Sequence, residues 1–139
     1  MNGYLLDTDT CISRLRRQFN IERRIAQIGR QDRYISEITV AELRFGAERS
    51  NQCEEQMRLI DALYEVFTVL PITAAIRHFA AEKARLWNIG QKIADFDLLI
   101  GATAIYYELI LVTNNTKHFE RMQSLRLENW MHILETGAK

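Results

Sequence analysis

The fold is decided by the stretch YLLDTDT at residues 4–10, a short apolar run that ends abruptly in acidic and hydroxyl side chains. Such an apolar run is typical of a buried strand, and Asp7 then stands where the strand ends. The stretch ILVTNN at residues 110–115 has the same design, an apolar strand followed by polar side chains. Binding sites of parallel α/β sheets lie at the carboxyl ends of strands. Both stretches therefore predict a site at one edge of such a sheet.

Strand and helix patterns alternate along the rest of the chain. Further strands are predicted at 33–36 and 66–70, and an edge strand at 125–128. Helices are predicted at 8–18, 21–28, 39–49, 54–64, 73–87 and 95–107, with a short helical turn around Phe119. The helix at 73–87 has a predicted inward face of Ile76, Phe79, Ala80, Ala84 and Trp87. This alternation predicts an α/β fold, a parallel sheet with helices on both faces.

The composition is that of an ordinary globular protein. The chain has 139 residues, 47% hydrophobic and 26% charged, which excludes a mostly disordered protein. One proline and the lack of a Gly/Ser-rich linker predict a single domain over residues 1–139. With no signal-peptide pattern, no membrane-spanning apolar run and only two cysteines, a cytoplasmic protein without membrane contact is expected.

Each acidic candidate also has a purely structural interpretation. Asp7 suits a turn after a strand. Thr39 and Glu42 have the spacing of a capping box, in which the glutamate closes a helix start. Asp95 and Asp97 suit the positive N-terminal end of a helix, although two acids exceed what one cap needs.

Taken together, these acids suit a divalent cation. Each stands beside an apolar element that would aim it at the same edge of the sheet. Carboxylates ~4 Å apart repel by about 4 kcal/mol per pair at an effective dielectric of about 20, and a cation removes that cost. Oxygen ligands favour Mg²⁺ or Mn²⁺. The scattered histidines are interpreted as ordinary surface or core residues: His78, His118 and His132.

Several segments share their order and spacing with a known family. They are LLDTDT at 5–10, ITVAELRFG at 38–46, IADFDLLIGA at 93–102 and LVTNNTKHFER at 111–121, with the ending LRLENW at 125–130. On these motifs the chain resembles the PIN-domain ribonucleases, and within them the VapC-type toxins of bacterial type II toxin–antitoxin modules. The resemblance covers essentially the whole chain. It implies a PIN-like three-layer α/β/α fold with a short, mostly parallel central sheet of four to five strands.

The resemblance also implies a site. Its metal-binding and catalytic carboxylates would be Asp7, Glu42 and Asp97, with Asp95 as an auxiliary catalytic acid. Asn115 would join the metal site, although many relatives carry an acid there. Thr113 would orient a neighbouring acid through its hydroxyl. The implied activity is an endoribonuclease dependent on Mg²⁺ or Mn²⁺, which cleaves phosphodiester bonds in RNA.

The same resemblance implies three partners. They are an RNA substrate (tRNA above all, with initiator tRNA suggested by the C-terminal part), a VapB-type antitoxin and a second copy of the chain. The segment at 14–33 is rich in arginine: Arg14, Arg16, Arg17, Arg23, Arg24, Arg30 and Arg33. These side chains form either a solvated face or a contact surface for RNA phosphates or an acidic antitoxin segment.

Two other functions fit parts of the sequence. DTDT at 7–10 fits the first motif of HAD-type phosphotransferases, in which Asp7 would be a nucleophile. That class needs a later lysine and a closing acidic pair, whereas the strand at 110–113 ends in two asparagines. A non-catalytic PIN-like module that binds nucleic acid or protein would be expected to lack a core acid, and Asp7, Glu42 and Asp97 are all present.

Overall fold

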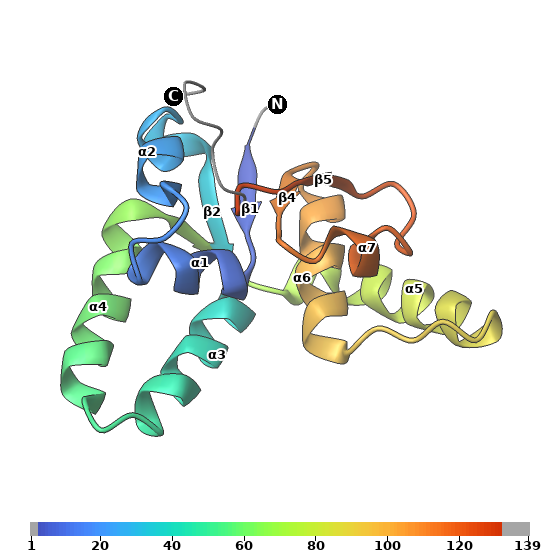
Figure 1. Ribbon diagram of the computed structural model, residues 1–139. Coiled ribbons are helices and arrows are strands. Elements are labelled where there is room, and N and C mark those ends of the chain that lie inside the picture. The colour runs from blue at the N-terminus through green and yellow to red at the C-terminus, as the bar shows by residue number, and fades with distance from the viewer. Residues whose placement is uncertain (1–2, 132–139) are drawn as a thin grey trace.

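The structure is a computed structural model that describes residues 3–131. Its centre is a five-stranded sheet in the order β3-β2-β1-β4-β5, with every neighbouring pair parallel (Figure 1). The strands are β1 (Tyr4–Leu6), β2 (Arg33–Ser36), β3 (Thr68–Leu70), β4 (Ile110–Val112) and β5 (Arg126–Glu128). The predicted α/β fold is confirmed, and the sheet is wholly rather than mostly parallel.

Helices cover both faces of the sheet, as the three-layer prediction requires (Figure 1). One layer contains α1 (Thr8–Leu15), α2 (Ile21–Ala26), α3 (Glu37–Glu48) and α4 (Cys53–Val66). The other contains α5 (Ile76–Asn88), α6 (Asp95–Tyr106) and the short α7 (Thr116–Phe119). Single 3-10 turns precede β2 (Arg30–Asp32) and α5 (Thr73–Ala75).

The two cores follow from the alternation of side chains along a strand. Leu6 and Val112 pack into the core under α1–α4, whereas their neighbours Leu5 and Leu111 pack into the core under α5–α7. Because β1 and β4 are buried on both faces, they appear in the sequence as unbroken apolar runs. None of the helices within residues 3–131 has the length and apolar character needed to cross a membrane.

The first helix is shorter than predicted, since it ends at Leu15 instead of continuing to Gln18. The backbone at Arg17, Phe19 and Asn20 has positive φ, a left-handed conformation that a helix cannot contain. Phe19 is consequently 37% exposed and does not extend the face of Ile12 and Leu15. At the other end of this layer, α4 continues to Val66, so β3 begins two residues later than expected.

The predicted inward face of α5 is wrong. Ile76 and Trp87 are 47% and 57% exposed, and Ala80 and Ala84 also face outward. The buried positions are instead Glu82 and Leu86, with Phe79 partly buried. Glu82 can be buried because its carboxylate accepts two hydrogen bonds from Arg85 and one from the Gln123 N–H. This rotation leaves an apolar stripe of α5 uncovered.

Helix α6 is buried on most sides, as its apolar sequence predicts. Leu98, Ile100, Ala102 and Ala104 are at most 1% exposed. Gly101 lies where an added Cβ would meet the Met122 sulfur at 2.5 Å, so the helix packs closely on the segment after α7. This packing fixes the N-terminal turn of α6, which carries Asp95 and Asp97.

Candidate active site

The candidate site lies at the carboxyl edge of the two central strands. β1 and β4 are in register with Leu6 opposite Val112, so the residues after them are neighbours. The Asp7 N–H donates to the Val112 carbonyl at 3.0 Å, which fixes the end of β1 against β4. Asp7 and Thr113 therefore emerge side by side. β4 ends one residue earlier than the predicted strand 110–113, so Thr113 and not Asn114 directly follows it.

Asp7 is both a helix cap and a buried acid. Its side chain accepts a hydrogen bond from the Thr10 N–H at 2.9 Å and so caps α1. Only 6% of the residue is exposed. Burial raises the pKa of Asp7 to about 6, against the opposing effects of hydrogen bonds from Thr113 and Thr10. The orienting role of the Thr113 hydroxyl stays a prediction.

The capping-box interpretation of Thr39 and Glu42 is wrong. Helix α3 begins two residues earlier, at Glu37, and its cap is Ser36, whose hydroxyl accepts from the Ile38 N–H at 3.0 Å. Thr39 is fully buried inside the first turns, and Glu42 lies in the second turn, half-buried. The Glu42 carboxylate accepts a hydrogen bond from the hydroxyl of Thr8, the residue after Asp7. Glu42 therefore does not cap α3, and its hydrogen bond from Thr8 holds it near the end of β1.

Asp97 faces a histidine that the sequence did not identify. The His118 Nε2 lies 3.3 Å from Asp97 Oδ2, between the first turn of α6 and α7. Partial burial raises the pKa of Asp97, while His118 acts in the opposite direction. His118 is therefore not an ordinary surface or core residue. Its place after the strand end at 113–115 is the sequence signal that could have identified it.

Asp9 is a second residue that sequence analysis missed. It is exposed in the first turn of α1, and its charge raises the pKa of both Asp7 and Asp97. Because this effect requires proximity, the negative charges of α1 and α6 belong to one electrostatic cluster. The sequence signal that could have identified Asp9 is an acidic residue three positions after Leu6, the last residue of β1.

Asp95 and Asn115 are both exposed, in contrast to the buried Asp7. Asp95 Oδ1 forms an exposed ion pair with Lys83 Nζ of α5 at 2.9 Å. Asn115 is exposed at the start of α7, and its N–H donates to the Thr113 hydroxyl at 3.0 Å. The structure thus brings Asp7 and Thr113 together and sets Glu42 beside them, while Asp95 and Asn115 lie at the rim.

The donor chemistry of the site suits a hard divalent cation. Burial raises the pKa values of Asp7 and Asp97, so a bound cation would favour their charged forms. Oxygen is the only donor type among the predicted ligands, as Mg²⁺ and Mn²⁺ prefer. Within residues 3–131, no three His, Cys, Asp or Glu side chains already stand close enough to hold an ion. Thr8 and His118 hold Glu42 and Asp97, so these carboxylates would have to turn inward.

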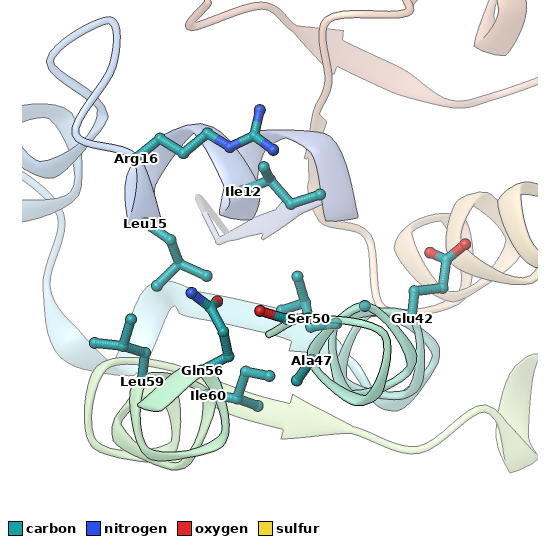
Figure 2. Close-up of a pocket in the computed structure, with 11 residues that line it drawn as sticks. Ile12, Leu15, Arg16, Glu42, Ala47, Ser50, Gln56, Leu59 and Ile60 are labelled. Atoms are coloured by element: carbon teal, nitrogen blue, oxygen red, sulfur yellow. The ribbon is translucent and has the colours of Figure 1, made fainter. Parts of the chain in front are cut away.

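An apolar groove of about 330 Å³ meets the site at Glu42 (Figure 2). Ile12 and Leu15 of α1, together with Arg16 directly after it, form one wall, and α3 and α4 form the other. In Figure 2 Glu42 stands at the end of the groove, on α3. A second hollow of about 660 Å³ shares Leu15 and Leu59 with the first and extends it along α2. A segment bound in this groove would thus end beside the acidic cluster.

The arginines of segment 14–33 fall into two groups. Four have partners within the fold: Arg14 with Glu22, Arg24 with Glu128, Arg30 with carbonyl groups at the end of α4, and Arg33 with the Ile28 carbonyl. No side-chain hydrogen bond or ion pair is found within residues 3–131 for the other three, which line the groove: Arg16, Arg17 and Arg23. Whether these arginines form a solvated face or contact RNA or an antitoxin stays a prediction, and the three without partners are the candidates for contact.

Comparison with known proteins identifies the family. The PIN domain family matches residues 4–125. The "tRNA(fMet)-specific endonuclease VapC" of Shigella flexneri is 34% identical over 131 residues, covering 94% of this chain and 99% of the relative. "Ribonuclease VapC2" of Haemophilus influenzae is 40% identical over 136 residues, covering 94% of this chain and all of the relative.

Solved structures give the same result for the fold. The DNA-bound VapBC structure from Salmonella typhimurium has a TM-score of 0.86 and 32% identity, and covers 94% of this chain and 99% of that chain. The VapBC-1 structure from nontypeable Haemophilus influenzae has a TM-score of 0.83 and 32% identity, covering 93% and 98%. Both are described as VapBC structures.

Proposed function

The chain belongs to the PIN domain family, and within it to the VapC ribonucleases, and on that premise we propose that it is a Mg²⁺- or Mn²⁺-dependent endoribonuclease toxin. The observation that carries the proposal is the acidic cluster at the carboxyl edge of β1 and β4. Asp7 is buried there with a pKa raised to about 6, and the charge of Asp9 raises both this pKa and that of Asp97. The comparisons give no support to a phosphotransferase or a non-catalytic module.

Each residue of the site has a defined task in this proposal. Asp7, Glu42, Asp97 and Asn115 would hold the cation through their side-chain oxygens. When bound, the cation would lower the pKa of a coordinated water and stabilise negative charge on the phosphate. The Thr10 N–H orients the Asp7 carboxylate, and the Thr113 hydroxyl favours its charged form. Asp95, at the rim, is proposed as an auxiliary acid only.

Cleavage of purified RNA tests the activity. The parent protein is expected to cut RNA with Mg²⁺ or Mn²⁺ and to stop when EDTA removes the cation. In a bacterial host, expression without a partner should arrest growth, and Asp7→Ala should abolish the arrest. Equal toxicity of the Asp7→Ala protein at the same expression level would refute the nuclease proposal.

The proposed substrate is tRNA, with initiator tRNA as the first candidate. Support comes from the name of the Shigella flexneri relative, a tRNA(fMet)-specific endonuclease 34% identical to this chain. A protein that cleaves tRNA would act in the cytoplasm, where tRNA is found. Sequencing of RNA 5′ ends after induction is expected to show new ends in initiator tRNA, and ends confined to ribosomal RNA would contradict this choice.

The proposed inhibitor is a VapB-type antitoxin whose segment lies in the groove between α1 and the α3–α4 pair. The groove is apolar at Ile12, Leu15 and Leu59 and carries Arg16, whose side chain has no hydrogen-bond or ion-pair partner among residues 3–131. An amphipathic segment with acidic residues would match both features. A matched pair of variants tests this: Arg16→Glu should weaken antitoxin binding, whereas Arg30→Gln, away from the groove, should not.

A homodimer is proposed through the uncovered face of α5. We define the α5–α6 surface as the exposed apolar side chains Ile76, Trp87, Ile89 and Phe96. Two contacts hold this surface together: Lys92 Nζ lies 4.3 Å from the centre of the Trp87 ring, and Lys83 pairs with Asp95 beside Phe96. An apolar stripe that the fold leaves in water is stabilised by covering it with a second copy.

A further inference from the structure

The outward face of α3 carries one large apolar side chain. Phe45 is 65% exposed, more than any other large apolar residue within residues 3–131. The exposed positions around it on the helix are small or polar: Glu37, Ala41, Gly46, Glu48 and Arg49. A single exposed phenylalanine is not by itself a sign of function. Two further features, its place on α3 and the charge beside it, distinguish Phe45 from an ordinary surface residue.

The first feature is that Phe45 lies one turn from Glu42. Residues three apart on a helix are neighbours on its surface, with Cβ atoms about 5–6 Å apart. The Glu42 carboxylate in turn accepts a hydrogen bond from the hydroxyl of Thr8, which directly follows Asp7. An exposed aromatic ring therefore borders the end of β1, where the proposed cleavage site lies.

The second feature is a positive charge over the ring. The guanidinium carbon of Arg49 lies 5.9 Å from the centre of the Phe45 ring. Arg49 is exposed at the end of α3, and within residues 3–131 its side chain has no hydrogen bond or ion pair. At this distance the guanidinium is at the limit of a cation–π contact, so it can turn to a phosphate or stack on a base without losing another partner.

The two protein partners proposed above fit this position less well. The groove assigned to the antitoxin is lined by Leu43 and Ala47 of α3 but not by Phe45. Phe45 exposes about 130 Å², if a fully exposed ring has about 200 Å², whereas one side of a standard protein interface buries about 800 Å². Because its neighbours add little apolar area, a planar ligand of the size of one ring matches Phe45 better than a protein surface does.

We propose that Phe45 and Arg49 form a stacking site for an unpaired nucleobase of the RNA substrate. The proposal rests on the proposed function, in which RNA is cleaved at the end of β1. Unpaired bases of RNA stack on phenylalanine rings and on arginine guanidinium planes. Every base has a flat face, so this site selects single-stranded nucleotides over a duplex and does not choose their sequence. The substrate class is therefore a loop, bulge or end of an RNA.

Binding of short RNA strands in EDTA, where no cleavage is expected, tests the site. The probes are an oligoadenylate of about ten nucleotides, its duplex with oligouridylate, and a strand of the same length that lacks bases. The parent is expected to bind the single-stranded oligoadenylate most tightly. Phe45→Ala should weaken this binding about tenfold, the loss expected for one stacked base, and should leave binding of the strand without bases unchanged.

Further variants separate stacking from a general apolar contact. Phe45→Trp should bind oligoadenylate at least as tightly as the parent does, and the RNA should quench the fluorescence of the added indole. Phe45→Leu keeps apolar area without a flat ring and should bind as weakly as Phe45→Ala. Arg49→Gln should lower the salt dependence of binding by about one phosphate contact. Tyr106→Ala, 53% exposed at the far end of α6, is the matched control and should bind as the parent does.

Three results would overturn the stacking site. They are parental affinity of Phe45→Ala or Phe45→Leu for oligoadenylate, equal binding of the strand without bases by the parent, and conversion of a dimeric parent into a monomer by Phe45→Ala, which would assign Phe45 to a contact between copies. Sedimentation of each variant measures the last of these. Because the side chain is exposed, every variant is expected to melt as the parent does.

RNA cleavage by the parent with Mn²⁺ shows which proposal has failed. If the parent cleaves RNA and the Phe45 variants bind oligoadenylate normally, the stacking site is wrong and the ribonuclease proposal stands. If the parent neither binds nor cleaves RNA, the ribonuclease proposal fails and the stacking site fails with it.

Discussion

Two opposing effects act on the pKa of the Asp7 side chain. Its hydrogen bonds from Thr10 and Thr113 favour the charged carboxylate, but burial disfavours it more strongly. The unfolded chain has no such burial, so its Asp7 titrates near the ordinary value of about 3.9. Charge on folded Asp7 at neutral pH therefore costs folding free energy whenever no cation is bound.

The first prediction concerns Asp7→Asn, which keeps a capping oxygen and removes the charge. Because the folded pKa is raised, the parent is expected to lose stability as pH rises from about 4 to about 6, on the order of 2–3 kcal/mol. The variant lacks this loss, so without divalent cations it should melt higher than the parent at pH 8 and equally at pH 3.5. It should cleave no RNA. If the melting temperatures of the parent and the variant change with pH in the same way, burial of a charged Asp7 is not the cause.

A second prediction contrasts the two acids of α6. Asp97 lies by His118 and shares the electrostatic field of Asp9, whereas Asp95 is paired with Lys83 at the rim. Asp97→Asn is expected to lower the RNA cleavage rate at least about hundredfold, about 2.7 kcal/mol of barrier. Asp95→Asn should cost less than about fivefold. Single-turnover cleavage rates measure both, and the reverse ranking would exchange their roles.

At the scale of elements, the start of α3 shows how a cap and a ligand can be confused. The spacing of Thr39 and Glu42 is that of a capping box, yet Ser36 caps the helix and Glu42 points to Thr8. The helix begins directly after β2, so its true cap is the last residue of a strand. Local spacing could not separate these cases, because the donor that holds Glu42 comes from α1.

The third prediction therefore pairs Ser36→Ala with Glu42→Gln. Ser36→Ala removes the acceptor for the Ile38 N–H and should cost about 1 kcal/mol of unfolding free energy while RNA cleavage is kept. Glu42→Gln should leave the unfolding free energy nearly unchanged and abolish most cleavage. Urea denaturation and cleavage assays measure the two effects. Loss of stability in Glu42→Gln with cleavage retained would return that residue to a structural role.

At the scale of the whole molecule, the α5–α6 surface has the size that an interface needs. With about 200 Å² for a fully exposed large side chain, its four residues expose about 400 Å². A standard interface buries about 800 Å² per partner, somewhat more than half of it apolar. The surface and its polar surroundings are therefore sufficient for one side of a symmetric dimer.

The fourth prediction is that Trp87→Arg converts a dimer into a monomer. Sedimentation equilibrium should show a dimeric parent and a monomeric variant with an unchanged melting midpoint at low concentration. Tyr106→Arg is the matched control, since Tyr106 is 53% exposed at the opposite end of α6. Should Trp87→Arg remain a dimer but bind RNA more weakly, the surface would belong to the substrate.

Patterns within a few residues determined much of this protein by sequence alone. The apolar runs at 4–6 and 110–112 were recognisable as strands because both of their faces are buried. Asp7 was placed correctly since it directly follows such a strand, whereas Thr113 was expected inside the strand and lies one residue after it. The apolar composition of α6 likewise predicted its burial. In all these cases the cause is local: side-chain period and strand ends are set by neighbours in the chain.

Contacts between distant segments decided the rest, and only the tertiary structure contains them. Thr8 reaches Glu42 across 34 positions, and Asp97 meets His118 on a different helix. The outward face of α5 depends on Arg85 and Gln123 together satisfying a buried Glu82, which no amphipathic pattern reveals. A polar side chain is assigned by its partner, and when that partner comes from elsewhere in the chain, only packing determines whether the residue caps, binds or supports the core.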